Sequence, residues 1–442
     1  MLDRTKQPVV NPLTDFTIQT PEQIIMPNGV PLNILRAGNE KVVRMDILIG
    51  AGTWHQKRPL QALFTNRMLR EGTQGMTSAE ISERLDFYGA WVELSTSMNC
   101  NFLTLYSLTR HFADTLSVVG DIMKNPTFPE AEMKVTVETN RQQFLVNSTK
   151  VDVMARKEFS RALFGEQHPC GRHAVLEDYD RLTTEHLRDF YRQYYHSGNC
   201  SIYLSGDIPE TTLRQVEDVF GSSPWGSGAV CEPLKPLPLP PYEGRRLFVE
   251  HPSAVQSSLR LGCPLVDRVH PDYAPLKVLT TVLGGYFGSR LMSNIREEKG
   301  YTYGINATIA SYPFNGYLVI GTETANEYVE ACISEVKHEM QRLQDELMPE
   351  QELSMVKNYM MGEMCRSYEG PFSLSEAWIF IETAGLEKDF FQTHAEKIRN
   401  VTAGELREMA IRYFRPDELL EVVAGKKCRT KPTFSPKKQK KT

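Results

Sequence analysis

Residues 48 to 90 read LIGAGTWHQKRPLQALFTNRMLREGTQGMTSAEISERLDFYGA, and this stretch carries the strongest fold signal in the chain. Within it, Pro59 can start a helix because proline suits the first helical position, and Gly72 can end one. Apolar residues recur between them at helical spacing, as Leu60, Leu63, Phe64 and Met68. The pattern predicts a short amphipathic helix whose apolar stripe faces a core.

Three phrases occur twice along the chain at nearly one offset. PEAEM at 129–133 recurs as PEQEL at 349–353, and LTTEHLR at 182–188 recurs as VTAGELR at 401–407. An apolar strand that ends at Gly206 likewise recurs as one that ends at Gly425. Because three separate pairs share the offset, we infer two homologous lobes of about 220 residues each, too long for a solenoid repeat.

A proline-dense segment separates the two lobes. Residues 222–244 read SSPWGSGAVCEPLKPLPLPPYEG, a composition that prevents helix and sheet pairing and favours an extended connector. Strands precede long amphipathic helices in each lobe, which predicts an α+β fold with a mainly antiparallel sheet covered on one face by helices. The predicted division is an N-terminal lobe at 1–221, a linker at 222–244, a C-terminal lobe at 245–427 and a basic tail at 428–442.

The composition is that of an ordinary globular protein. The chain is 41% apolar and 24% charged, with a formal net charge of -5, so we expect no broad attraction to nucleic acid or anionic membranes. Its 8 cysteines form no C-x-x-C pair, which indicates reduced thiols. The N-terminal residues lack an apolar export signal, and no run of residues approaches the roughly 18 apolar residues of a membrane span. We expect a cytoplasmic protein.

The quoted stretch resembles the first helical region of the pitrilysin/insulinase zinc peptidases, also called inverzincins. GSRLMSNIREEKGYTYG at 288–304 is similar to a segment of their C-terminal lobe, and LFGEQHPCGRH at 163–173 and LTTEHLRDFYRQYYHSGN at 182–199 are further family-like phrases. They occur in the family's order and span nearly the whole chain. The resemblance implies two α+β lobes that face each other as half of a clamshell chamber, which half-size members complete by pairing with a second chain.

Active members carry H-x-x-E-H on the first helix, where two histidines bind zinc and the glutamate is the general base. The aligned residues here are LFTNR, 63 to 67. Leu63 has no lone pair to offer, and Arg67 would repel a dication about 4 Å away by about 8 kcal/mol at an effective dielectric near 20. Asn66 stands at the position of the base, and an amide cannot accept a proton at neutral pH. The sequence therefore predicts that the helix forms but neither binds zinc nor supplies a general base.

The family's third zinc ligand is a glutamate on a later helix. The matching region, VETNRQQFLVNS at 137–148, has Glu138 as its only carboxylate, whereas Gln142 and Gln143 lie nearer the expected place. This ligand is therefore also predicted to be missing.

Other potential ligands are few. His168, Cys170 and His173 form the closest cluster, but they lie in a loop phrase that zinc peptidases of the family carry for structural reasons. His55 is a lone histidine, and such residues are most often hydrogen-bonded or exposed. We assign no metal and no other cofactor to this chain, and we expect zinc only in a partner subunit.

An arginine and a tyrosine seven residues apart are retained in the second lobe as Arg296 and Tyr303. In the family this pair contacts the substrate at the zinc site, the arginine holding a peptide carbonyl and the tyrosine stabilising the oxyanion, a role that their donors suit. Two structural alternatives stay open. Arg296 could belong to a solvated helical face, and Tyr303 alternates with Tyr301, Ile305, Ala307 and Ile309 in a pattern that would bury it.

We interpret the chain as a homologue that is not a peptidase by itself. The resemblance implies a non-catalytic subunit that supplies Arg296 and Tyr303 to a homologous H-x-x-E-H subunit acting on a peptide, and the edge strand at 91–96 could hold that peptide by strand addition. The alternative is an inactive homodimeric peptide-binding or scaffold protein. A hydrolase using serine or cysteine is the weakest interpretation, because no G-x-S-x-G motif is present.

Overall fold

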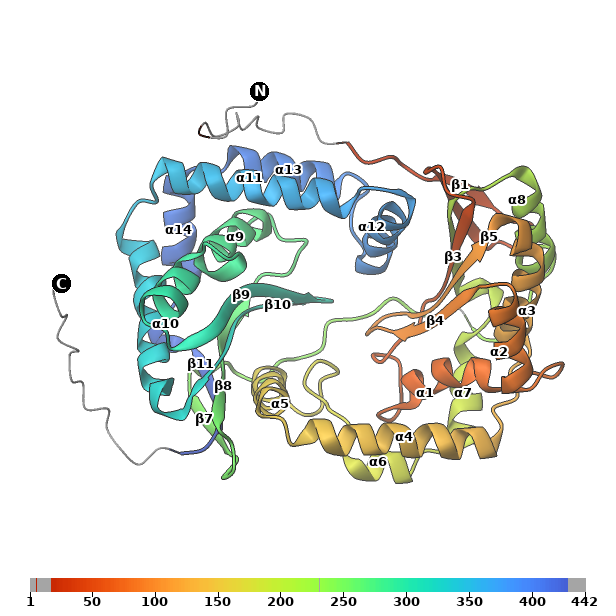
Figure 1. Ribbon diagram of the computed structural model, residues 1–442, viewed down its shortest axis with the longest axis horizontal. Coiled ribbons are helices and arrows are strands. Elements are labelled where there is room, and N and C mark those ends of the chain that lie inside the picture. Colours follow the sequence, from red (N-terminus) through yellow and green to blue (C-terminus); the bar gives the residue numbers. More distant parts are fainter. Residues whose placement is uncertain (1–4, 6–16, 230, 428–442) are drawn as a thin grey trace. The chain divides into compact units, whose positions relative to one another are not determined.

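A computed structural model describes residue 5 and residues 17–229 and 231–427 (Figure 1). The predicted basic tail at 428–442 lies outside these residues. The chain forms two compact units, each assembled from three segments. The first comprises Met1–Leu145, His173–Pro236 and Asn358–Glu396, and the second comprises Val146–Arg172, Leu237–Lys357 and Lys397–Thr442. Each helix in the described ranges is too short or too polar to cross a bilayer.

The first unit is built on a sheet with the strand order β1-β2-β6-β3-β5-β4. Neighbouring strands pair antiparallel, except that β2 and β6 pair parallel. The central strands are largely buried on both faces, and the face toward the first core is apolar, with Met45 between Leu105 and Leu204 on its two neighbours. The strands are β1 (Glu22–Ile25), β2 (Pro31–Arg36), β3 (Val42–Ile49), β4 (Trp91–Thr96), β5 (Asn101–Leu108) and β6 (Cys200–Gly206).

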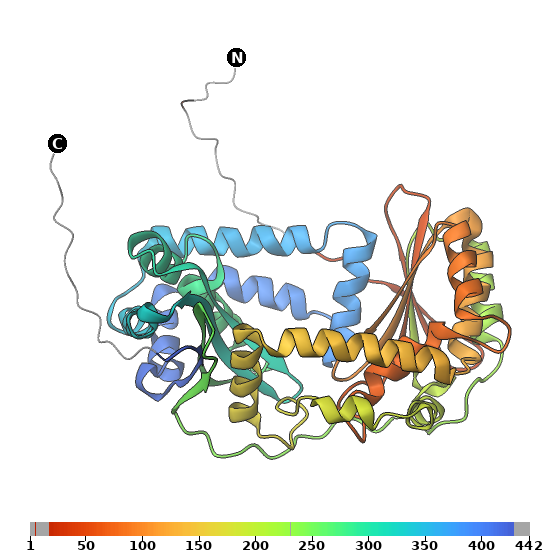
Figure 2. The same ribbon diagram turned by 60° about the horizontal axis from the view of Figure 1, so that its bottom comes forward.

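Helices from the N-terminal half of the chain cover one face of this sheet (Figure 1 and Figure 2). Their apolar sides join the strands in one core that includes Phe64, Phe112 and Phe190. The predicted helix at 59–72 is present as α1, which continues into a 3-10 turn at Met68–Glu71. The helices are α1 (Gln61–Arg67), α2 (Ser78–Phe87), α3 (Phe112–Lys124), α7 (Thr184–Tyr194) and α8 (Glu210–Val216).

The second unit contains a sheet with the order β7-β11-β8-β10-β9, in which only the β7–β11 pair is parallel. Helices α9 (Tyr273–Thr280), α10 (Val329–Asp345) and α14 (Ala403–Tyr413) lie on one face (Figure 1). The prediction of an α+β fold with mainly antiparallel sheets is confirmed. The strands are β7 (Arg246–Glu250), β8 (Gln256–Leu265), β9 (Thr302–Tyr312), β10 (Asn315–Ala325) and β11 (Leu420–Gly425).

The phrases that recur in the sequence form equivalent elements. Thr183 and Thr402 are the N-caps of α7 and α14, and each accepts a hydrogen bond from the third residue of its helix, at 3.4 and 3.2 Å. The apolar strands at the end of the repeat are β6 and β11, both fully buried. The offset therefore corresponds to a repeated helix–strand unit.

Each unit takes one helix from the other half of the sequence. Helix α5 (Val151–Phe164) precedes the proline-rich segment but packs on β8 and β11, whereas α12 (Pro371–Ala384) follows it but packs on β2 and β6. The remaining long helices, α4 (Glu130–Ser148), α11 (Glu350–Ser367) and α13 (Phe390–Asn400), each contribute residues to both units. The compact units are thus interleaved along the chain, in contrast to the contiguous lobes expected at 1–221 and 245–427.

Helix α12 docks through charged and polar contacts. Arg44 donates to both carboxylate oxygens of Asp46 at 2.9 Å and to Glu376 of α12 at 2.6 Å. Asp46 is 1% exposed and also accepts from Thr104 at 2.7 Å. Farther along, Tyr203 donates to Glu382 of α12 at 2.6 Å. The second face of this sheet is therefore closed by a buried ionic network, which a prediction of helices on one face omits.

We predict that breaking this network from one side costs more than removing the pair. Arg44→Met alone should lower the free energy of unfolding by about 3–5 kcal/mol, because it leaves the buried Asp46 carboxylate without a counter-charge. Asp46→Leu alone should cost less, because Arg44 keeps Glu376 as its partner. The double variant should lose markedly less than the sum, since Glu376 is 63% exposed and stays solvated. Urea denaturation of the four proteins measures the coupling, and additive losses would contradict it.

Candidate functional site

The helix that carries the degenerate zinc motif is anchored by its own motif residues. Leu63, at the first ligand position, packs half-buried against the core. Asn66, at the position of the base, is 1% exposed and forms three hydrogen bonds. Its amide nitrogen donates to the carbonyls of Ser95 at 2.7 Å and Phe102 at 3.1 Å, and its oxygen accepts from the Tyr195 hydroxyl at 3.0 Å.

These contacts give Asn66 a structural role. Its amide joins α1 to β4, β5 and the end of α7, and burial raises the pKa of Tyr195, which keeps that hydroxyl protonated as a donor. Two carbonyl acceptors require an N–H donor, which a carboxylate cannot provide. The site that holds a base in active relatives is thus built here for a neutral amide.

Arg67, at the second ligand position, makes a hydrogen bond from its Nη1 to the side-chain oxygen of Asn140 on α4. Asn140 is therefore the α4 residue that contacts the predicted position of the second ligand. Glu138, Gln142 and Gln143 are instead exposed, and Gln142 bonds to Glu138 at 2.6 Å. Sequence spacing pointed to Gln142 and Gln143 because it did not reveal which α4 residue turns toward α1. The Arg67 guanidinium is thus held by the Asn140 amide.

The other ligand-type residues serve the local structure. His55 accepts a hydrogen bond from the Gly52 N–H at 3.1 Å, and burial lowers its pKa. His168 accepts from the Cys170 N–H at 3.1 Å and stacks on Phe164. Within the described parts of the chain, no three His, Cys, Asp or Glu side chains gather as metal ligands would.

The cysteine thiols have the character of structural residues. Burial raises the pKa of Cys100, Cys170 and Cys263 to about 12, so these thiols stay protonated at neutral pH. A protonated thiol is a poor nucleophile, and the geometry offers no support for cysteine hydrolysis at these positions.

Arg296 and Tyr303 lie together on the surface of the second unit. Arg296 sits on the short helix η6 (Met292–Glu298), and its guanidinium carbon lies 5.8 Å from the centre of the Tyr303 ring. The alternation that would bury Tyr303 is wrong at this residue: Ile305, Ala307 and Ile309 are buried as expected, but Tyr303 is 93% exposed. The two side chains lie next to each other, and their contact with a substrate stays a prediction.

A β-bulge explains the exposure of Tyr303. Ile305 faces Thr322 and Thr302 faces Thr324, so Tyr303 and Gly304 together oppose the single residue Glu323. The extra residue reverses the alternation and turns the phenol outward. The Thr302 hydroxyl fixes the bulge by donating to the Glu323 carbonyl at 2.7 Å.

Arg296 is held mainly by aromatic rings. Its guanidinium carbon lies 4.5 Å from the centre of the Phe287 ring, closer than to Tyr303, and Phe287 is itself 64% exposed. Arg296 has only a long contact of 3.9 Å with Glu297 and donates no hydrogen bond within the described residues. Its donors are therefore free for an acceptor, while cation–π contacts restrict the side chain. No pattern in the sequence pointed to Phe287.

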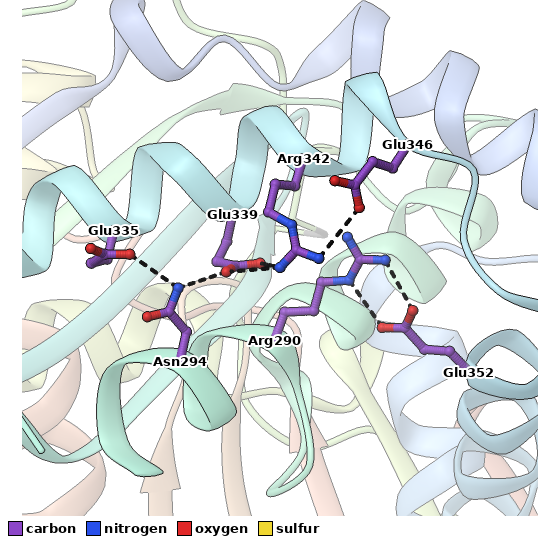
Figure 3. Close-up of polar contacts among 7 residues, drawn as sticks. All are labelled: Arg290, Asn294, Glu335, Glu339, Arg342, Glu346 and Glu352. Carbon is purple, nitrogen blue, oxygen red and sulfur yellow. Dashed lines mark hydrogen bonds and ion pairs between the residues drawn. The ribbon is translucent and has the colours of Figure 1, made fainter. Parts of the chain in front are cut away.

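A polar network fixes the helix that presents Arg296 (Figure 3). Arg290 donates to both oxygens of Glu352 on α11, at 3.0 and 2.9 Å. Asn294 donates to Glu335 and Glu339 on α10, at 3.1 and 2.6 Å, and Arg342 also donates to the buried Glu339. These residues line a cavity of about 470 Å³. The network ties η6 to α10 and α11 and so positions Arg296.

The edge strand expected at 91–96 is β4, which forms one margin of its sheet and pairs only with β5. Trp91 at its start is 64% exposed. The strand thus offers an unpaired backbone edge among the described residues of the first unit.

Several known proteins are similar to this chain in sequence. Residues 181–360 match the family model of the peptidase M16 inactive domain. An uncharacterized zinc protease YmxG of Bacillus subtilis is 25% identical over 77% of this chain and 83% of its own length. The non-peptidase homolog YmxG of Helicobacter pylori is 22% identical over 86% of this chain and 88% of its own.

The fold is also similar to that of a solved structure. A crystal structure of a peptidase M16 inactive domain from Pseudomonas fluorescens superposes with a TM-score of 0.81 at 23% identity, covering 93% of this chain and 100% of that one. These similarities agree with the predicted resemblance to the zinc peptidases, and one of the relatives is named as a non-peptidase.

We predict that Asn66 matters to stability more than Arg67 does. Asn66→Ala should lower the free energy of unfolding by about 3 kcal/mol or more, because it leaves two carbonyls and a hydroxyl buried without partners. Arg67→Ala, which removes one hydrogen bond from a half-exposed side chain, should cost less than about 1.5 kcal/mol. Urea denaturation compares them, and equal losses would argue against an anchoring role for Asn66.

A zinc site should be restorable only through Asn140. The variant Leu63→His, Arg67→His, Asn140→Glu should retain about one zinc per chain after gel filtration, because it supplies two imidazoles and a carboxylate. The matched variant with only the two histidine substitutions, which keeps Glu138, should retain far less. Metal content by mass spectrometry decides, and stoichiometric zinc in the native chain would contradict the assignment of no metal.

Proposed function

We propose that this chain, a homologue of the M16 zinc peptidases, is the non-catalytic subunit of a heterodimeric metallopeptidase. It would present Arg296 and Tyr303 to a peptide bound at the zinc of a homologous H-x-x-E-H partner. The observation that supports this most is the bulge in β9, which exposes a tyrosine where strand alternation would bury it. A bulge that re-aims a side chain is a feature with a local cost and is typical of functional sites.

The chemistry of the pair suits a peptide carbonyl. Arg296 has unengaged N–H donors, and Tyr303 has a solvent-exposed hydroxyl. A guanidinium can hold the carbonyl of the bound peptide, and a phenol can donate to the oxygen as negative charge develops on it. Such donors act only where zinc and a base are supplied, and α1 has neither a ligand set nor a carboxylate at the position of the base. The proposal therefore needs a second chain.

Reconstitution tests the subunit role. The chain is purified alone and with a homologue bearing H-x-x-E-H, such as one encoded beside it, and cleavage of a casein-derived peptide mixture is measured. Activity should appear only in the mixture and be lost on chelation. Tyr303→Phe should lower kcat by roughly a hundredfold to a thousandfold, the usual effect of removing an oxyanion donor.

Arg296→Ala should act mainly on KM if its donors hold the substrate in the ground state as well. Arg415→Ala is the matched control, because Arg415 is an exposed arginine paired with Glu418 in the same unit. Cleavage by the chain alone that resists chelation would overturn the proposal. A stable homodimer that binds peptide and forms no complex with the homologue would favour the scaffold alternative instead.

A further inference from the structure

A second arginine without hydrogen bonds lies on the sheet of the second unit. Arg260 is on β8, next to Gly321 of β10 and Val422 of β11. Its Nε is buried without a partner, and across the part of the chain that the structure describes the guanidinium makes no hydrogen bond or ion pair. Leaving a desolvated cation unpaired is costly, and buried arginines are normally matched by a carboxylate.

The backbone around Arg260 is shaped to hold its guanidinium. A Cβ on Gly321 would lie 2.3 Å from Nη1 and 3.1 Å from the guanidinium carbon, so only glycine leaves room for the group to lie against β10. Asn306 of β9 is beside the same glycine and is exposed. The guanidinium therefore occupies a fixed place on the face of the sheet rather than extending into solvent.

Helix α5 borders this place without covering it. Gly262, two residues along β8 on the same face, is in close contact with Phe159 of α5, where an added Cβ would meet the ring at 2.9 Å. Figure 1 shows α5 beside the β8 end of the sheet. Arg260, by contrast, is only partly buried and is reached from outside. The aromatic rings of Phe159 and Tyr317, with centres 5.9 Å apart, lie close to Arg260.

The electrostatic surroundings leave Arg260 short of an anion. Burial first and the neighbouring Arg156 of α5 second lower the pKa of its guanidinium. Asp152 and Glu323 are close enough to oppose this shift, but neither forms an ion pair with Arg260. Arg156 is exposed and close enough to act on Arg260, so two cations lie near each other while the local carboxylates form no ion pair with Arg260 among the described residues.

We propose that Arg260, with Arg156 beside it, binds the carboxylate of an acidic peptide side chain on the face of the second sheet. A planar guanidinium with free donors matches a carboxylate in bidentate geometry. That the carboxylate belongs to a peptide rests on the proposed function. The binding itself requires no zinc subunit and is therefore tested on the chain alone.

The test follows the arginine Nε–H resonances of arginine-labelled protein by NMR during titration with acetyl-Ala-Glu-Ala-amide. The resonance that disappears in Arg260→Met belongs to Arg260. It should shift with the glutamate peptide, and acetyl-Ala-Gln-Ala-amide, of the same shape but neutral, should bind roughly tenfold to a hundredfold more weakly. Equal binding of the two peptides, or no shift at Arg260, would overturn the proposal.

Three variants separate binding from folding. Arg260→Met should abolish the preference for the glutamate peptide while Tm stays equal or rises by a few degrees, because an unpaired desolvated charge is removed. Gly321→Ala should weaken binding severalfold by displacing the guanidinium, whose flexible end can move without unfolding the sheet. Arg70→Met, at an exposed arginine of the first unit, is the matched control and should change neither.

Two other outcomes are decisive against the proposal. A large fall in Tm for Arg260→Met with peptide binding unchanged would make Arg260 a structural residue. Glutarate binding as tightly as the glutamate peptide would show that a free carboxylate suffices and would overturn the assignment to peptides. Failure of reconstitution with a zinc subunit leaves this titration unaffected, so the two proposals fail separately.

Discussion

The buried amide of Asn66 is the contact on which the first unit depends. It satisfies two strand carbonyls and a tyrosine hydroxyl at once, and so joins one helix to two strands and to the end of another helix. A carboxylate there would face carbonyl oxygens instead of donating to them. Asn66 thus anchors the helix with a neutral donor at the position where the resemblance places a general base.

Arg67 is likewise held by a hydrogen bond to a neighbouring element. Its guanidinium is fixed by Asn140 and places a positive charge next to α4. In the second unit, polar contacts instead fix the helical segment that carries Arg296. Arg290, Asn294 and Arg342 engage carboxylates on α10 and α11, whereas Arg296 on the same helical segment keeps its donors unengaged between two aromatic rings. Satisfied groups form the support, and the unsatisfied group faces outward.

Much of the fold was predictable because it follows local patterns. The helix at α1, the strands and the repeated capping threonines arise from apolar spacing and short-range hydrogen bonds, which a sequence displays directly. The exposure of Tyr303 was not predictable from alternation, because the bulge depends on how β9 pairs with β10. Asn140 and Phe287 escaped notice for a related reason: which side of a helix or loop meets a distant residue is a tertiary property. The crossing of α5 and α12 between the units has no local signal at all.

That crossing affects how the chain can reach its native state. Arg44 of β3 and Glu376 of α12 are separated by 332 residues, yet their side chains form a hydrogen bond. During synthesis the first sheet lacks α12, and Arg44 and Asp46 stay uncovered, until almost the whole chain has left the ribosome. Contacts that close such long loops form late and slowly. Cutting the chain at its proline-rich segment would leave each fragment without the helix that packs on its sheet, so neither half of the repeat contains all the elements of one compact unit.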